Sequence, residues 1–179
     1  MLDFKNNFEF GDVKIINFLN ITNKENEMIR TWRNNTNVRK FMFSDHIILP
    51  QEHYTFILKL KDDNKNFFWL VKKNEEYVGT ISLNRIDFNN GNAYLGLYAN
   101  PDNKVSGAGQ ILIGCLKKLA FNVANLHSLK LEVIDTNERA KLFFKKSKFS
   151  EEGRLKDFVN KSGKWYDVIV MGILNSDTG

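Results

Sequence analysis

The chain has 179 residues, 42% of them hydrophobic and 13% aromatic, which is enough for one hydrophobic core but few for two, so we expect a single domain over residues 1–179. Its apolar runs are far shorter than the roughly 20 residues of a membrane-spanning helix, and its first residues lack the pattern of a secretory signal, so we expect a cytoplasmic protein with no membrane partner. The formal net charge of +5 fits an anionic ligand and a Lys- and Asn-rich composition equally well, and without a Lys/Arg block we expect no nucleic-acid partner.

Cysteine and histidine give little sign of chemistry. The single cysteine, Cys115, lies among Leu112, Leu116 and Leu119 at helical spacing, so we interpret it as a buried packing residue and not as a nucleophile. His46 and His127 fit structural roles. No group of residues has metal-ligand spacing, and we expect no metal.

The N-terminal part of the chain predicts a strand and two helices. Residues 13–19 alternate as in a strand, and Thr22 with Glu25 forms a T-x-x-E capping box that begins a helix reaching about Asn34. Pro50 suits the first turn of a second helix. The apolar side of that helix is predicted to carry Tyr54, Ile57, Leu58 and Leu60.

Three strands follow in the middle of the chain. Residues 67–71 and 77–86 are typical of a hairpin joined by a polar turn at residues 73–76. The Asn-Asn-Gly-Asn turn at residues 89–92 then leads into a strand over residues 93–99.

From Gly107 the hydrophobic period becomes that of an amphipathic helix. Strand periodicity returns at residues 129–134, and Asn137 is a good N-cap for a helix carrying Ala140, Phe143 and Phe144. Strands at residues 152–159 and 165–173 complete the chain. This order predicts an α/β (α+β) fold in which a mixed, mostly antiparallel seven-stranded sheet has helices on both faces.

The most informative segment is the one from Tyr94 to Gln110. A strand ends near Pro101, a short loop follows, and Gly107 and Gly109 begin a helix, so several backbone N–H groups converge at the positive end of that helix. Such an arrangement binds anions, and a side chain at either glycine would obstruct a diphosphate. An ordinary helix start would show the same pattern.

The pattern Lys104-x-x-Gly107-x-Gly109 resembles the R/Q-x-x-G-x-G/A pyrophosphate-binding motif of GNAT acetyltransferases, with Lys in place of Arg or Gln. Leu131-Glu132-Val133 and the stretch from Asn137 to Gly153 resemble the strand, helix and hairpin that follow in this family. The resemblance implies the GNAT fold, a splayed central strand pair (residues 93–99 and 129–134) and acetyl-CoA as the acetyl donor. It also implies a set of coenzyme contacts: Leu97, Tyr98, Lys104, Val105, Ser106, Gly107, Ala108, Gly109, Gln110, Asn137 and Phe144.

Further segments resemble the branch of the family that acetylates amino sugars in pseudaminic acid biosynthesis, a pathway of flagellin glycosylation. They are Trp32-Arg33-Asn34, the region of His53, residues 94–101, 126–133 and 152–156. This implies that the acceptor is the 4-amino group of a UDP-linked 4-amino-4,6-dideoxy sugar.

We expect Arg33, His53 and Arg85 to contact the diphosphate of this acceptor. Its sugar and base would lie against Tyr94, with Phe41 or Phe43. Arg33 fits a helix-capping role equally well, and His53 a structural one.

Acetyl transfer to an amine requires a base, a polarised carbonyl and a proton for the leaving thiolate. Glu132 alternates with two apolar neighbours, so we predict that it faces the acceptor and acts as the base through water. The resemblance adds Ser82 as a proton relay. Phe144 occupies the position where many members carry the tyrosine that protonates the thiolate, which leaves Tyr98 or water for that step. Glu132 as a surface carboxylate and Tyr98 as a packed aromatic are the structural alternatives.

Two other functions stay open. The same segments also resemble GNAT enzymes that acetylate protein N-termini or polyamines, although a cationic polyamine would favour an acidic cleft. A non-catalytic coenzyme A-binding module is the second alternative, because it would tolerate Phe144 in place of a proton donor. Pairing of edge strands could make the protein a homodimer.

Overall fold

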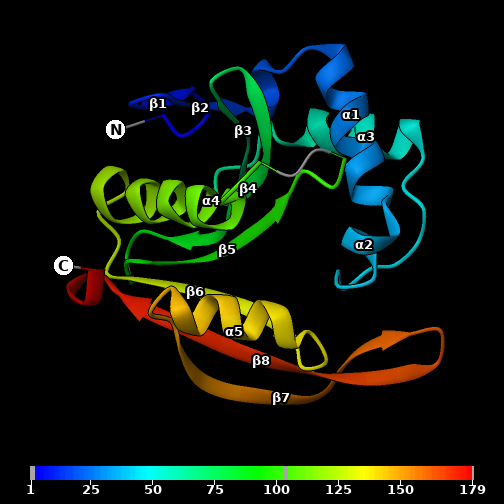
Figure 1. Cartoon of the computed structure of the whole chain (residues 1–179), viewed down its shortest axis with the longest axis vertical. Coiled ribbons are helices and arrows are strands. Elements are labelled where there is room, and N and C mark those ends of the chain that lie inside the picture. The colour runs from blue at the N-terminus through cyan, green and yellow to red at the C-terminus, as the bar shows by residue number, and fades with distance from the viewer. Residues whose placement is uncertain (1–2, 103–104, 179) are drawn as a thin grey trace.

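The computed structural model describes residues 3–102 and 105–178 of the chain. These form an eight-stranded sheet in the order β1-β2-β3-β4-β5-β6-β8-β7 (Figure 1). The strands are β1 (Phe8–Phe10), β2 (Val13–Asn17), β3 (Phe67–Lys73), β4 (Glu76–Asp87), β5 (Asn92–Ala99), β6 (Ser128–Ile134), β7 (Ser150–Lys161) and β8 (Lys164–Leu174). The helices are α1 (Asn23–Asn34), α2 (Thr36–Arg39), α3 (Pro50–Lys59), α4 (Ala108–Lys117) and α5 (Glu138–Lys146), with 3-10 turns at Phe18–Asn20 and Asn175–Thr178 and a π-helical turn at Lys118–Val123.

All neighbouring strands are antiparallel except β5 and β6, which are parallel. This confirms the predicted mixed, mostly antiparallel sheet. The sheet has one strand more than the seven predicted, because β1 also pairs with β2. β1 has only three residues, too few for a period of two to be recognised in the sequence.

Local sequence signals account for several element boundaries. Both hydrogen bonds of the Thr22–Glu25 capping box are present at the start of α1. Asn74 and Glu75 join β3 to β4 with φ angles of 48° and 63°, as a tight two-residue hairpin turn requires. Asn137 caps α5 by accepting a hydrogen bond from the Ala140 N–H.

Helix α3 does not bury the face predicted from its apolar residues. Tyr54 and Leu58 are exposed, whereas His53 and Leu60 are buried, and Phe56 and Ile57 pack against the same core as Leu60. The prediction of the buried face is thus confirmed for Ile57 and Leu60 and wrong for Tyr54 and Leu58, because it counted only apolar residues. The spacing 53, 56, 57 and 60 is itself that of one helix face, with a histidine as its first member.

Helices cover both faces of the sheet, as predicted (Figure 1). On one face, α4 and α5 pack on the larger core through residues such as Leu112, Leu116 and Phe144. On the other face, Ile29 and Trp32 of α1 lie with Leu70 of β3 in a smaller core. In the described part of the chain, no helix is long and apolar enough to cross a membrane.

Strands β5 and β6 are paired over only part of their length. Register pairs join Asn92 to Ser128, Ala93 to Leu129 and Tyr94 to Lys130, and none follows, although β5 continues to Ala99 and β6 to Ile134. This confirms the predicted splayed pair. It leaves main-chain groups of both strands facing a gap.

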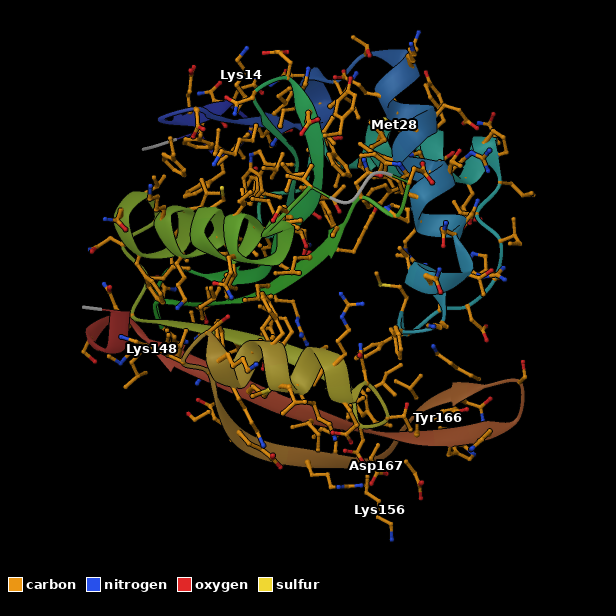
Figure 2. The ribbon with its side chains drawn as sticks, in the orientation of Figure 1. Lys14, Met28, Lys148, Lys156, Tyr166 and Asp167 are labelled. Carbon is orange, nitrogen blue, oxygen red and sulfur yellow. The ribbon has the colours of Figure 1, made fainter. Side chains whose placement is uncertain are left out.

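The hairpin of β7 and β8 bends near its middle. The register shifts between Leu155 and Val159, and Asp157, with φ of 48°, donates its N–H to the Asp167 carboxylate. The distal half of the hairpin thereby extends beyond the rest of the sheet, with Lys156, Tyr166 and Asp167 near the bend (Figures 1 and 2).

Candidate active site

A cavity of about 1250 Å³ lies where β5 and β6 separate. Its coenzyme side is formed by the loop before α4 and by the start of α5. The opposite side is formed by α1, α3 and the segment after α2, and we call it the acceptor side because the predicted acceptor contacts Arg33 and His53 lie there. The tip of the β7–β8 hairpin contacts that last segment, because Lys161 Nζ donates to the Lys40 carbonyl and the rings of Phe43 and Phe158 meet edge to face.

Most of the predicted coenzyme contacts line this cavity. They are Leu97, Tyr98, Val105, Gly107, Ala108, Gly109, Gln110, Asn137 and Phe144. Ser106 is exposed and is not among the lining residues. The prediction for Lys104 lies outside the described residues.

The two glycines of the motif are needed for different reasons. Gly107 is the N-cap of α4 with a φ of 70°, a left-handed conformation that favours glycine, and a Cβ there would meet nothing within 4 Å. A Cβ at Gly109 would lie 2.9 Å from Cε2 of Phe143 on α5. A side chain at Gly109 would therefore collide with Phe143 of the protein itself, whether or not a diphosphate is bound. This glycine lets α5 approach α4.

The start of α4 fits the diphosphate of coenzyme A. The first N–H groups of a helix have no acceptor within it, and the described loop before α4 supplies no side-chain cap. Such groups at the positive end of a helix bind phosphate oxygens. Main-chain donors of Gly109 and Gln110 would hold the diphosphate there.

The backbone of β5 supplies one donor to the gap. Antiparallel pairing alternates between residues whose main-chain groups face the partner strand and residues whose groups face away. The Asn100 N–H donates to β4, and the Gly91 carbonyl accepts from the residues that begin β6. Odd-numbered residues of β5 therefore face β6, so the Leu97 N–H faces the gap, where it can donate to a thioester carbonyl. The main chain of Tyr98 faces β4.

The side chain of Glu132 lines the cavity with 14% of its surface exposed, and its Oε1 lies 2.9 Å from Nη2 of Arg85. The guanidinium carbon of Arg85 lies 3.6 Å from the centre of the Tyr94 ring. Neither Arg85 nor Tyr94 is among the residues that line the cavity. The structure therefore places Arg85 and Tyr94 outside the lining of this cavity, and their predicted contact with the acceptor stays a prediction.

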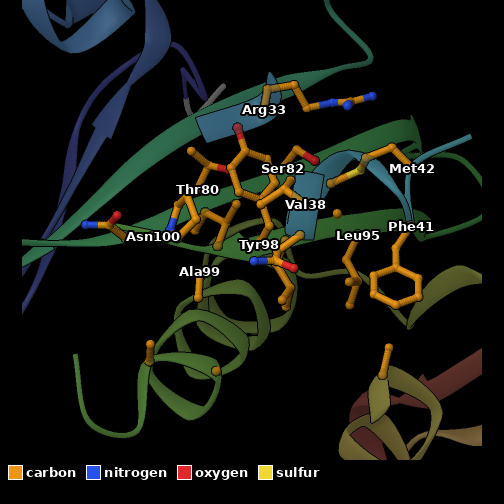
Figure 3. Close-up of a pocket in the computed structure, with 18 of the residues that line it drawn as sticks. Arg33, Val38, Phe41, Met42, Thr80, Ser82, Leu95, Tyr98, Ala99 and Asn100 are labelled. Atoms are coloured by element: carbon orange, nitrogen blue, oxygen red, sulfur yellow. The ribbon is translucent and has the colours of Figure 1, made fainter. Parts of the chain in front are cut away.

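Ser82 and Tyr98 lie on the acceptor side with Thr80 (Figure 3). Ser82 is buried, and its hydroxyl accepts a hydrogen bond from the Asn84 amide at 2.9 Å. It lies next to Gly96, where a Cβ would be only 2.6 Å from the hydroxyl. Burial raises the pKa of Tyr98 above the usual value, against the opposing effects of the Thr80 hydroxyl and the Arg33 charge. The phenol therefore stays protonated at neutral pH.

Arg33 and His53 both line the acceptor side and each has an unsatisfied nitrogen. Arg33 Nη2 lies 3.2 Å from the Ser44 carbonyl, but Nη1 is buried and has no partner among the described residues. Burial lowers the pKa of this guanidinium. His53 Nε2 is likewise buried and unpaired in the described structure. Burial lowers the pKa of His53, while a hydrogen bond to the Asn26 backbone opposes the shift, so the ring is neutral at pH 7 with Nε2 as an acceptor.

The sequence could not have shown these neighbours of the predicted residues. The Arg85–Glu132 ion pair joins β4 to β6, and the contact of Gly109 with Phe143 joins α4 to α5. Thr80 alternates with Ser82 on β4 and carried no signal of its own. Among the described residues, no group of His, Cys, Asp or Glu could hold a metal ion.

A model of the family described as Acetyltransferase (GNAT) domain matches residues 19–170. The chain belongs to the GNAT acetyltransferase family, and it is an acetyl-CoA-dependent N-acetyltransferase.

Two curated relatives differ in what their names say. Acetyltransferase PseH of Campylobacter jejuni is 32% identical over 146 residues, which cover 82% of this chain and 90% of PseH. Spermidine N(1)-acetyltransferase of Vibrio cholerae is 25% identical over 173 residues, which cover 94% of this chain and 90% of that enzyme.

Solved structures give the same two neighbours. The Vibrio cholerae spermidine N-acetyltransferase in complex with CoA and spermine has a TM-score of 0.84 at 22% identity, covering 94% of this chain and 99% of that one. Campylobacter jejuni PseH in complex with acetyl coenzyme A has a TM-score of 0.69 at 25% identity, covering 90% and 98%. The similarity at 22% identity shows the shared fold and does not select an acceptor.

We predict that Gly109→Ala destabilises the protein by about 1–3 kcal/mol, because the new methyl group must displace the Phe143 ring. The KM for acetyl-CoA should rise with it, since Phe143 lines the coenzyme side. Gly114→Ala is the matched control in the same helix. Its Cβ would meet nothing within 4 Å, so this change should stabilise by about 0.5–1 kcal/mol. Urea unfolding measures both variants, and equal stabilities would contradict the prediction.

Cys115 is buried, as predicted, and burial raises its thiol pKa to about 11. We expect the native protein not to react with an aromatic disulfide reagent at pH 8, because the thiolate is both scarce and inaccessible. The same reagent should titrate one thiol per chain in guanidinium chloride. Rapid modification of the native protein with loss of turnover would contradict the structural role.

Proposed function

We propose that the acceptor is the 4-amino group of a UDP-linked 4-amino-4,6-dideoxy sugar, and that the reaction belongs to pseudaminic acid biosynthesis and so to flagellin glycosylation. The similarity to PseH over most of the chain supports this proposal. The observation that carries it is the pair of unsatisfied buried nitrogens, Arg33 Nη1 and His53 Nε2, on the acceptor side.

An unsatisfied buried polar group lowers stability by about 1–3 kcal/mol. This pair therefore indicates a ligand that forms a hydrogen bond with each of the two nitrogens. Arg33 can only donate, and it suits the oxygens of a diphosphate. The neutral His53 can accept at Nε2, which suits a hydroxyl group. A nucleotide sugar carries both kinds of group. A polyamine carries ammonium groups, which only donate and which the Arg33 charge repels.

The cavity offers a cationic polyamine little unpaired negative charge. Of the described carboxylates that line it, Glu132 forms an ion pair with Arg85, and Glu52 is hydrogen-bonded to His46, which carries a charge only when it is protonated. The cations Lys40 and Arg139 line it as well as Arg33. This balance favours an anionic acceptor over the polyamine alternative.

We propose the following catalytic roles for the residues of the cavity. Acetyl-CoA supplies the thioester carbonyl, and the amine of the acceptor attacks it. The N–C bond forms and the C–S bond breaks. The ammonium loses two protons, of which one passes through water to Glu132 and then to solvent. The other replaces the proton that Tyr98 gives to the thiolate.

Ser82 and Leu97 have supporting roles in this mechanism. The Ser82 hydroxyl lies on the acceptor side and can relay a proton between the amine and water. The Leu97 N–H polarises the thioester carbonyl. Phe144 is buried against Phe149 and Phe143, so it packs beside the coenzyme and donates no proton.

The acceptor is tested with UDP-4-amino-4,6-dideoxy-N-acetyl-β-L-altrosamine, spermidine and a peptide with a free N-terminal amine, followed by thiol release and by mass spectrometry of the product. We expect the nucleotide sugar to have the highest kcat/KM. Arg33→Gln should raise the KM for this acceptor about tenfold or more, since it removes a charge-assisted hydrogen bond, with the KM for acetyl-CoA unchanged.

Arg39→Gln is the matched control for Arg33→Gln, because Arg39 follows on α2 and does not line the cavity. Preference for spermidine or for the peptide would contradict the proposed acceptor. Tight binding of acetyl-CoA with no acetylated product from any amine would support the non-catalytic alternative.

We predict that Tyr98→Phe lowers kcat by about 10² or more, because it removes the hydroxyl that we propose protonates the thiolate; the raised pKa of the phenol keeps this proton in place across the neutral range. The KM for acetyl-CoA should not change. Tyr54→Phe, which removes an exposed hydroxyl outside the cavity, is the control. Turnover of Tyr98→Phe equal to that of the wild type from pH 6 to pH 9 would exclude Tyr98 as the acid.

A further inference from the structure

Strand β4 contains a bulge beside the active site. Asn84 pairs with Tyr94 and Asp87 with Asn92, so three steps along β4 match two along β5. Alternation would place Arg85 on the same face as the buried Leu83. The extra residue instead gives the buried position to Ile86, and Arg85 adopts a left-handed φ of 52°. The bulge turns Arg85 to the face that carries Tyr94 and Glu132.

A neighbouring loop holds this backbone in place. The Arg85 N–H donates to the Asn66 side-chain oxygen at 3.0 Å, and the Ile86 N–H donates to the Lys65 carbonyl at 3.0 Å. Asn66 is itself fixed, since its amide donates to the Asp63 carboxylate at 2.8 Å. A left-handed arginine is an unfavourable conformation that persists where its surroundings determine it, and such residues cluster at functional sites.

The side chain of Arg85 crosses β5 to reach β6. Its guanidinium lies over the ring of Tyr94, with Cζ 3.6 Å from the ring centre, and Nη2 forms the ion pair with Oε1 of Glu132. Tyr94 is also in the last register pair that joins the two strands. Arg85 therefore links the strands where they separate, through its ion pair with Glu132.

We propose that Arg85 is a positioning residue for acetyl transfer: supported by the Tyr94 ring, it holds the Glu132 carboxylate where it can accept a proton from the acceptor amine or its relaying water. This inference rests on the proposed role of Glu132 as the base. It replaces acceptor binding by Arg85, because Arg85 does not line the cavity and its charge already has a partner. Carboxylate placement matters, since a displacement of about 1 Å at a reacting group can cost about 10²-fold in rate.

The test is a double-mutant cycle of Arg85→Ala and Glu132→Gln, measured with the amine of the panel that gives the highest kcat/KM. If no panel amine is acetylated, the same cycle is measured on the slow hydrolysis of acetyl-CoA, in which water replaces the amine. Arg85→Ala should lower kcat by about 10- to 100-fold with both KM values unchanged. In the Glu132→Gln background it should have no further effect, because the two residues act as one unit.

Two other variants separate positioning from folding. Arg85→Lys should recover part of the lost kcat, since an ammonium can pair with Glu132 but cannot lie on the ring as the planar guanidinium does. Tyr94→Ala should lower kcat as Arg85→Ala does. Lys14→Ala, which removes a comparably exposed cation from an ion pair on β2, is the control and should leave kcat unchanged.

The outcomes distinguish this inference from the proposed function. A raised acceptor KM at unchanged kcat would show that Arg85 binds the acceptor, and multiplicative effects in the double variant would show that it acts independently of Glu132. Either result overturns the positioning role alone. Near-wild-type turnover of Glu132→Gln would overturn the base assignment, and the positioning role with it. The identity of the preferred amine affects neither conclusion.

Discussion

The active site of this protein depends on the end of backbone pairing between β5 and β6. Parallel strands share hydrogen bonds as long as they run side by side, and here they do so for three register pairs. Beyond that point, β5 exposes the Leu97 N–H and β6 carries Glu132, and the loop before α4 closes the coenzyme side of the same gap. A continuous ladder would have used these main-chain groups and left no room for a pantetheine arm. The bulge in β4 matters for the same reason, because it directs Arg85 across the point of separation.

The two sides of the cavity meet their ligands by different means. The coenzyme side relies on main-chain donors and on the absence of side chains at glycines, so its chemistry is set by backbone conformation. The acceptor side has side chains from α1 and α3 with buried polar atoms that lack a partner among the described residues, as Arg33 and His53 show. A protein keeps such unsatisfied groups at a cost in stability. The coenzyme side is thus determined by backbone conformation, and the proposed acceptor side by individual side chains.

The sequence predicted best what depends on neighbouring residues. The capping box at Thr22, the turn at Asn74 and the N-cap at Asn137 are local, and the glycine motif pointed to the start of α4. Prediction from the sequence failed where a contact between distant residues decides the structure. β1 forms because it can pair with β2, which would otherwise be the edge strand of the sheet. His53 faces the core because of the way α3 packs on the rest of the fold. Strand alternation alone would place Arg85 on the face opposite Glu132, and the bulge that changes this is visible only from the register of the partner strand. The role of Gly109 likewise required knowledge of where Phe143 lies.

The short pairing of β5 with β6 also affects the thermodynamics of the whole chain. Only three register pairs connect the ladder of β1 to β5 with that of β6, β8 and β7, so a molecule bound in the gap touches both ladders at once. Any ligand that binds the native state and not the unfolded chain adds RT ln(1 + [L]/Kd) to the free energy of unfolding. The thermal midpoint of this enzyme should therefore report coenzyme occupancy, and cellular acetyl-CoA would protect the chain from unfolding and proteolysis.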